Sequence, residues 1–215
     1  MAPNPDNPCL RLAVLISGSG SNLQALIDAI ESKRLPNAEI VLIVSSKPGA
    51  YGLQRALRHK LPAIYLPWKQ RAGGEIKLAA LLQLFQADLI VLAGWMHILS
   101  ARFLDQFPKR VINLHPALLP DDGTGEMYVT SDGTSIPVFR GLHAVQQALD
   151  TGVKVTGSTV HYVTPTVDAG PVICREEIAI KEGDSEESLH KRIKMVEHRL
   201  IVEAVRAIGT SARHP

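Results

Sequence analysis

Two polar side chains suited to acyl-type chemistry stand two positions apart near the middle of the chain. Asn113 and His115 end a short apolar run and precede a proline. In an extended segment both side chains leave on the same face. An amide can donate a hydrogen bond to a developing oxyanion and an imidazolium can donate a proton, so the pair indicates catalysis. The alternative is that His115 only satisfies a backbone carbonyl, in a segment with two prolines.

A glycine-rich turn near the N-terminus is the second candidate site. Gly18 and Gly20 lie between an apolar run and a helical pattern, and Ser21 and Asn22 add side-chain donors. Such a turn lets the backbone approach a ligand, and the start of a helix favours an anion. Leu23 stands where the dinucleotide fingerprint needs its third glycine, so we predict a site for a single phosphate. The alternative is a tight turn followed by an N-cap.

A carboxylate completes these candidates only if the fold brings it close to them. Asp168 lies in a turn with Pro and Gly, where an aspartate most often serves to form the turn. Against His115, its carboxylate would raise the pKa of the imidazole and hold it protonated. His161 by itself is typical of a packed histidine. The basic residues expected to be solvated charges are Arg71, Arg140, Lys194 and Arg199.

Composition excludes several classes of protein. The 215 residues are 46% hydrophobic and 20% charged with a net charge of +2, which fits a globular protein and gives no argument for nucleic acid binding. Two cysteines, with no C-x-x-C or H-E-x-x-H motif, favour a reducing compartment and predict no metal site. The longest apolar stretch, Leu89–Met96, is shorter than the ~20 residues that cross a bilayer. We therefore expect a cytoplasmic protein with no membrane partner.

Strands and helices must alternate along the first half of the chain to position these side chains. Apolar runs at 12–16, 40–44, 63–66, 87–93 and 111–114 are typical of buried parallel strands. Helical patterns between most of them predict an α/β, Rossmann-like, mostly parallel sheet with helices on both faces. Two β-rich runs, 155–163 and 171–180, predict an antiparallel C-terminal extension of this sheet. A pattern similar to a capping box, Asp184 with Glu187, precedes a long C-terminal helix.

We expect one domain over residues 11–208, between a disordered N-terminal tail, 1–10, and a C-terminal tail, 209–215. One segment, Asp121–Val138, is rich in Gly, Asp, Thr and Ser and is expected to form a long loop, or a small hairpin around residues 131–134. It carries four acidic residues, no Lys or Arg, and little apolar area. We therefore expect most of it to be mobile and to point away from a pocket that binds anions.

These segments, in this order, resemble the phosphoribosylglycinamide formyltransferases of the formyltransferase superfamily. The resemblance runs from Leu12 to about Val205, and its clearest motifs are at 14–25, 91–99, 112–120, and 157–163 with 168–171. Asn-x-His-Pro-x-Leu-Leu-Pro marks the superfamily, and Ser-Gly-Ser-Gly-Ser-Asn-Leu narrows it to this family. The resemblance implies formyl transfer from 10-formyltetrahydrofolate, as cosubstrate and without a metal, to the amine of glycinamide ribonucleotide in purine biosynthesis.

The resemblance also implies a role for individual residues. It makes Asn113, His115 and Asp168 catalytic, with His161 supporting them. It implies that glycinamide ribonucleotide contacts Gly20, Ser21, Asn22 and Glu197. It implies that 10-formyltetrahydrofolate contacts Arg71, Met96, His97, Ile98, Leu99 and Asn113, and that residues 163–168 lie beside it. The expected partners are these small molecules, with the chain as a monomer or a homodimer.

Two features depart from the family pattern. His97 stands where the family usually has Arg, and Asp121–Val138 delays a segment that begins at Phe139. One alternative is a formyltetrahydrofolate hydrolase, expected to carry an N-terminal regulatory domain. Another is a formyltransferase acting on another amine, such as a charged tRNA, which would be expected to carry a further C-terminal domain. A third is an inactive phosphate-ligand binding module, against which intact Asn113, His115 and Asp168 argue.

Overall fold

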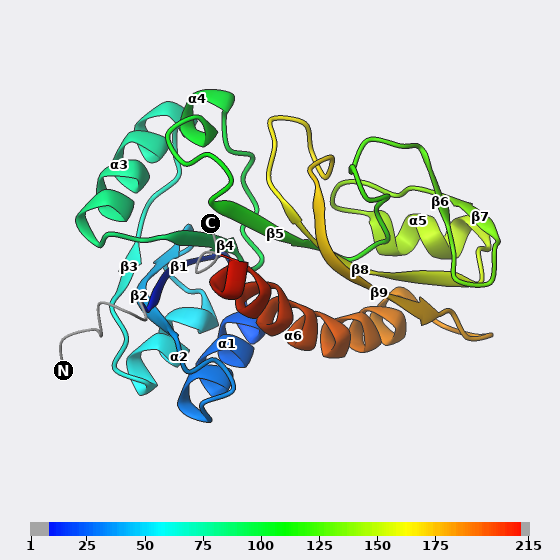
Figure 1. Cartoon of the computed structure of the whole chain (residues 1–215), viewed down its shortest axis with the longest axis horizontal. Coiled ribbons are helices and arrows are strands. Elements are labelled where there is room, and N and C mark those ends of the chain that lie inside the picture. The colour runs from blue at the N-terminus through cyan, green and yellow to red at the C-terminus, as the bar shows by residue number, and fades with distance from the viewer. Residues whose placement is uncertain (1–8, 212–215) are drawn as a thin grey trace. The chain divides into compact units, whose positions relative to one another are not determined.

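The computed structural model describes residues 9–211, and within them the chain forms nine strands and six helices (Figure 1). In chain order these are β1 (Leu10–Ile16), α1 (Ser21–Glu31), β2 (Ala38–Ser45), α2 (Tyr51–Arg58), β3 (Ala63–Tyr65), α3 (Arg71–Leu84), β4 (Leu89–Leu92), α4 (Ala101–Leu104), β5 (Val111–His115), β6 (Met127–Val129), β7 (Ser135–Pro137), α5 (Ala144–Thr151), β8 (Val155–Tyr162), β9 (Val172–Ala179) and α6 (Glu186–Ser211).

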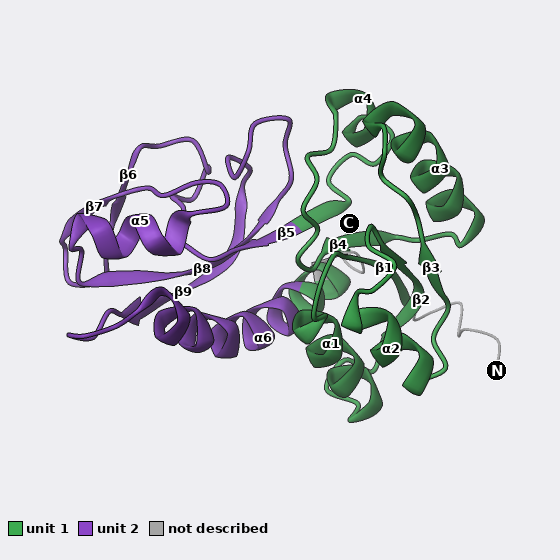
Figure 2. Ribbon diagram, turned by 180° about the vertical axis from the view of Figure 1, so that it is seen from behind, with its two compact units in different colours: residues 1–112, 205–215 green, residues 113–204 purple. Residues whose placement is uncertain are grey.

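The described residues divide into two compact units (Figure 2). Unit 1 runs to Ile112 and resumes at Val205, and unit 2 is Asn113–Ala204. Most of the two predicted tails, namely residues 1–8 and 212–215, lies outside the described residues. At the described ends of the chain, β1 begins at Leu10 and α6 continues to Ser211.

The main sheet confirms the predicted fold class. Its seven strands run in the order β3-β2-β1-β4-β5-β8-β9. β1 pairs in parallel with β2 and β4, β2 pairs in parallel with β3, and β9 pairs antiparallel with β8. The parallel part, the antiparallel extension and the long C-terminal helix are all present as predicted.

Unit 1 is built on strands buried on both faces. Residues 12–16 of β1 are fully buried, as their continuous apolar run predicts. Helices α1 and α2 lie on one side of these strands, and α3 and α4 lie on the other (Figure 1). The carboxyl ends of β1 and β4 therefore lie between two layers of helices. In folds of this kind, ligands bind at the carboxyl ends of the strands.

In unit 2, α5 and the first turns of α6 share an apolar cluster. Val145 of α5 packs with Leu189 and Ile193 of α6. The capping box of α6 lies one residue later than predicted. Reciprocal hydrogen bonds join Ser185 and Ser188, from the Ser188 amide to Ser185 Oγ at 3.2 Å and from the Ser185 amide to Ser188 Oγ at 3.0 Å.

The irregular segment Asp121–Val138 forms a hairpin, one of the two predicted outcomes. β6 and β7 pair antiparallel, and the Thr130 amide donates to the Thr134 carbonyl across the turn at 2.9 Å. The expectation that this segment buries little apolar surface is wrong. Tyr128 and Ile136 are only 9% and 5% exposed and pack against Leu118. The Gly, Ser and Thr content of the segment did not indicate this burial, because two well-placed apolar side chains are enough to pack the hairpin.

Candidate functional site

The Asp168 carboxylate brings three other side chains together in unit 2. Its Oδ2 lies 3.2 Å from His115 Nδ1, at the end of β5. Its Oδ1 lies 3.5 Å from His161 Nε2, on β8, and accepts from Asn113 Nδ2 at 3.4 Å. Both histidines are only 2% exposed. The structure therefore meets the condition under which Asp168 matters to the chemistry, since it lies against His115.

Burial sets the charge of this cluster as much as the neighbouring groups do. Burial acts to raise the pKa of Asp168, but hydrogen bonding from His161, the charge of His115 and the Gly141 amide outweigh it and lower that pKa to about 2. Burial also lowers the pKa of His115, and the Asp168 carboxylate, which acts to raise it, does not overcome this. The prediction of a raised His115 pKa is thus wrong, because pattern reasoning included the carboxylate but not the burial.

Both ring nitrogens of His115 face oxygen atoms. Nε2 donates to the Phe139 carbonyl at 2.7 Å, and Nδ1 faces the Asp168 carboxylate. A carbonyl only accepts, so the charged ring, with a proton on each nitrogen, satisfies both neighbours. The alternative interpretation of His115 as a histidine that satisfies a carbonyl therefore describes one nitrogen and leaves the other to Asp168.

His161 is held in one orientation by its own strand. Its Nδ1 lies 2.9 Å from the Tyr162 carbonyl, which fixes a proton on that nitrogen. Its Nε2 lies 3.3 Å from Asn113 Nδ2 and 3.5 Å from Asp168 Oδ1. His161 thus faces both Asn113 and Asp168, which is more than a packed histidine would do.

Three consecutive residues that sequence reasoning did not place in the site support this cluster. The Phe139 carbonyl accepts from His115, and the Gly141 amide donates to Asp168 Oδ2 at 2.8 Å. Arg140 Nε donates to the Asp168 carbonyl at 3.1 Å, so the expectation that Arg140 is a solvated charge is wrong. The available signals were their position directly after the irregular segment and the resumption of the family pattern at Phe139.

The glycine-rich turn in unit 1 has the geometry of an anion site. Gly20 adopts φ 68°, the left-handed region, and is the N-cap of α1, which begins at Ser21. A glycine N-cap has no side chain to accept from the first-turn N–H groups, and the first turn contains no acidic residue. These N–H groups and the helix dipole therefore suit an anion such as a phosphate.

The turn is fixed by the start of α2. The Gly52 amide donates to the Gly18 carbonyl at 3.1 Å, and a Cβ on Gly20 would lie 2.7 Å from Gly52 Cα. Arg55 Nε donates to the Ser19 carbonyl at 2.9 Å, and its guanidinium lies 4.9 Å from the centre of the Tyr51 ring. Two glycines in contact and one arginine thus hold the backbone of the turn.

The residues that the resemblance assigns to the folate lie mostly in unit 1, after β4. Met96 and Ile98 are exposed, whereas Leu99 is buried. The Met96 amide donates to Ser17 Oγ at 3.1 Å, which ties this segment to the start of the glycine-rich turn. Arg71, also assigned to the folate, is the exposed first residue of α3. Glu197, assigned to the ribonucleotide, is buried in the part of α6 that belongs to unit 2.

His97, at a position where the resemblance leads us to expect an arginine, belongs to an aromatic group. Its ring stacks on Trp68 with centroids 5.4 Å apart and meets Trp95 at 5.3 Å. Partial burial and the charge of Lys47 lower the pKa of His97. The side chain at this position is therefore an aromatic ring with a reduced tendency to carry a charge.

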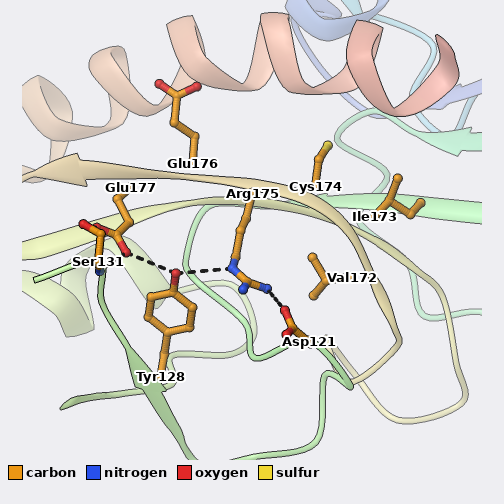
Figure 3. Close-up of a pocket in the computed structure, with 9 residues that line it drawn as sticks. All are labelled: Asp121, Tyr128, Ser131, Val172, Ile173, Cys174, Arg175, Glu176 and Glu177. Carbon is orange, nitrogen blue, oxygen red and sulfur yellow. Dashed lines mark hydrogen bonds and ion pairs between the residues drawn. The ribbon is translucent and has the colours of Figure 1, made fainter. Parts of the chain in front are cut away.

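A cavity of about 680 Å³ in unit 2 lies outside the Asp168 cluster (Figure 3). Arg175 crosses it, donating to Tyr128 Oη at 3.3 Å and to Asp121 Oδ1 at 2.5 Å. The residues that line it are Asp121, Tyr128, Ser131, Val172, Ile173, Cys174, Arg175, Glu176 and Glu177. Over residues 9–211, no group of three or more His, Cys, Asp or Glu could hold a metal ion. No helix in the same part of the chain is long and apolar enough to cross a membrane.

Known proteins resemble this chain over nearly its whole length. The family profile described as "Formyl transferase" matches residues 10–127 and 133–205, leaving out 128–132 in the hairpin. The trifunctional purine biosynthetic protein adenosine-3 of Bos taurus is 39% identical over 94% of this chain, which spans only 18% of that relative. The phosphoribosylglycinamide formyltransferase of Escherichia coli is 34% identical over 89% of this chain and 83% of its own. The crystal structure of glycinamide ribonucleotide transformylase 1 from Symbiobacterium toebii superposes with a TM-score of 0.84, at 37% identity, over 97% of this chain and 90% of that one.

Proposed function

The chain belongs to the formyl transferase family, and we propose that it transfers the formyl group of 10-formyltetrahydrofolate to the amine of glycinamide ribonucleotide. The products are formylglycinamide ribonucleotide and tetrahydrofolate, in purine biosynthesis. The names of the Escherichia coli and Symbiobacterium toebii relatives support this substrate. The observation that carries the proposal is the group of half-buried Asn113 and buried His115 and His161 around the Asp168 carboxylate.

Each member of this group has a task in attack of an amine on a formyl carbon. Asn113 donates a hydrogen bond to the formyl oxygen as negative charge develops there. His115 in its charged form donates a proton, and burial, by lowering the pKa of His115, makes this imidazolium a stronger acid. Asp168, with its pKa lowered to about 2, stays ionised and favours that charged form. His161 faces both the Asn113 amide and the Asp168 carboxylate and helps to position them.

The remaining assigned residues bind and orient the substrates. The N–H groups at Gly20, Ser21 and Asn22 bind the phosphate of glycinamide ribonucleotide, since the start of α1 favours an anion. Glu197 binds its ribose.

Arg71 and the segment Met96–Leu99, together with Asn113, bind the folate, which supplies the formyl group. The exposed apolar side chains of Met96 and Ile98, next to Trp95 in the sequence, fit a ligand with flat rings. The substrates are small molecules, and the chain acts in the cytoplasm as a monomer or a homodimer. Light scattering after size-exclusion chromatography distinguishes these two states.

One assay tests the proposal against the alternatives. The purified protein is given 10-formyltetrahydrofolate labelled with ¹³C in the formyl group, with glycinamide ribonucleotide, water alone or a charged tRNA as acceptor. The label is expected in formylglycinamide ribonucleotide only. Label released as formate without acceptor would indicate a hydrolase, label on the tRNA a different transferase, and no release at all a binding module.

The Arg102→Gln variant serves as a matched control for protein handling, because Arg102 is an exposed residue of α4 that is assigned to neither substrate. It is expected to formylate glycinamide ribonucleotide like the unchanged protein. The His115→Ala variant in the same preparation should lose most of the signal, which ties the activity to the cluster.

A further inference from the structure

The guanidinium of Arg140 connects two segments of unit 2 that are far apart in the sequence. Its Nε donates to the Asp168 carbonyl at 3.1 Å. Its Nη2 donates to the carbonyls of Gly123 and Gly125 at 2.9 and 2.7 Å, and its Nη1 lies 3.5 Å from a Glu126 carboxylate oxygen. The Arg140 side chain is only 20% exposed. Three backbone carbonyls on one side chain match the rigid fork of N–H donors that an arginine presents.

The segment Asp121–Glu126, which we name the brace, packs directly on the turn that follows Asp168. Gly123 adopts φ 77°, and a Cβ built on it would lie 2.3 Å from the Gly170 carbonyl oxygen. The Val172 amide donates to the Asp121 carbonyl at 3.0 Å. The brace therefore does not point away from the Asp168 cluster, and the expectation that most of residues 121–138 would do so is wrong for this part.

Asp168 needs such support because of its own backbone. It adopts φ 48°, in the left-handed region that residues other than glycine seldom occupy. Such a conformation persists only where the surroundings hold it. Its carboxylate must also keep a fixed direction, since Oδ2 faces His115 and Oδ1 faces His161 and Asn113.

We propose that Arg140, acting with the brace, is a positioning residue that holds the Asp168 turn in the orientation needed for catalysis. This inference rests on the proposed formyl transfer. The hydrogen bonds of Arg140 go to the Asp168 carbonyl and to the brace, so its positioning action is exerted through the backbone of Asp168, while its charge also acts to lower the pKa of His115. Loss of Arg140 frees the turn, so that the Asp168 carboxylate no longer faces His115 in most molecules.

A double-mutant cycle tests this mode of action. Arg140→Ala is made in the unchanged protein and in Asp168→Asn, and kcat and the two KM values are measured for each. In the unchanged protein we expect kcat to fall roughly 10- to 100-fold, with each KM within about threefold. In Asp168→Asn, whose carboxylate is already gone, the same substitution should cost less than about threefold. Equal losses in both backgrounds would mean a general structural role and would overturn the proposal.

Conservative and control variants sharpen the cycle. Arg140→Lys should recover part of the lost kcat, because an ammonium reaches only some of the three carbonyls. Arg175→Gln is the matched control, since Arg175 is similarly buried, at 26% exposed, and binds Asp121 of the brace but not the Asp168 turn. It should keep kcat within about threefold of the unchanged protein. A loss as large as that of Arg140→Ala would show that any arginine on the brace has this effect.

Two further measurements keep the inference falsifiable if Arg140→Ala folds poorly or the unchanged protein shows no turnover. Gly123→Ala keeps the guanidinium but forces the brace off Gly170, and should lower kcat in the same way. The imidazole ¹⁵N shifts of His115 report its contact with Asp168 without any turnover. They should change in the same direction in Arg140→Ala and in Asp168→Asn, and to a smaller extent in Arg140→Lys, and unchanged shifts would overturn the positioning role. Without formyl transfer by the unchanged protein the proposed function fails; full kcat in Arg140→Ala refutes only the inference.

Discussion

The glycine-rich turn of unit 1 and the Asp168 cluster of unit 2 are built in opposite ways. The turn is made of backbone, with Gly20 at φ 68° and the Gly52 amide bonded to the Gly18 carbonyl. The cluster is made of side chains, brought to Asp168 from positions as many as 55 residues away. A backbone site fails when a Cβ is added, whereas a side-chain site fails when a functional group is removed. The two regions should therefore respond to different classes of substitution.

Removal of the imidazole should have the largest effect. His115→Ala should lower kcat by at least about 100-fold, which is the usual size of a general acid–base contribution. KM for both substrates should change little, because His115 is buried in the cluster and is not assigned to substrate binding. Steady-state kinetics with each substrate varied in turn measure both quantities. Near-normal turnover would show that His115 takes no part in the mechanism and that the Asp168 cluster is not a catalytic site.

Loss of the Asp168 charge should act mainly through pH. The carboxylate acts to raise the pKa of His115 against burial, so Asp168→Asn should lower that pKa further below its ordinary value of 6.5. A smaller fraction of His115 is then charged at neutral pH, and kcat there should fall roughly 10- to 100-fold. The remaining activity should rise as pH falls, because protonation restores the acid. An NMR titration that gives the same His115 pKa in both proteins would contradict this pairing.

The same contrast explains what the sequence could predict. The turn could be predicted because its glycines, the strand before it and the helix after it are neighbours in the chain, so the local sequence pattern is enough to identify it. The strands could be predicted from the sequence because a run such as residues 12–16 is apolar at every position and must be buried on both faces. Asn113 and His115 could also be predicted as a pair from local sequence, since a spacing of two residues in a strand places both side chains on the same face.

Contacts between segments far apart in the chain could not be predicted from the sequence pattern alone. Nothing in the turn around Asp168 specifies that it lies against His115, and only the family resemblance suggested it. The burial that lowers the pKa of His115 and the carbonyls that capture Arg140 are likewise properties of the packed chain. An isolated arginine is solvated by default, and only the folded backbone shows otherwise.

A Cβ in the glycine-rich turn should affect substrate capture more than chemistry. Gly20→Ala adds a Cβ 2.7 Å from Gly52 Cα at a positive φ, so the backbone must shift. We expect kcat/KM for glycinamide ribonucleotide to fall roughly tenfold, mostly through KM, because the N–H groups that bind phosphate move with it. Gly18→Ala is the control, since a Cβ there meets nothing within 4 Å and its φ is not positive. If the two variants behave alike, the turn is not a backbone-built anion site.

The hairpin β6–β7 should have the smallest effect on turnover, although it contributes to stability. The Val138 amide donates to the Glu126 carbonyl at 2.9 Å, so a short glycine link can replace residues 127–137 and leave the brace intact. Removing the buried Tyr128 and Ile136 should reduce the free energy of unfolding by roughly 2–4 kcal/mol, which urea denaturation measures. kcat/KM should stay within about threefold, because the hairpin contacts Leu118 and Glu177 and not the Asp168 turn. The comparison requires that the variant is folded in the absence of urea. A large loss of kcat in the folded variant would show that the hairpin, and not the brace alone, supports the Asp168 cluster.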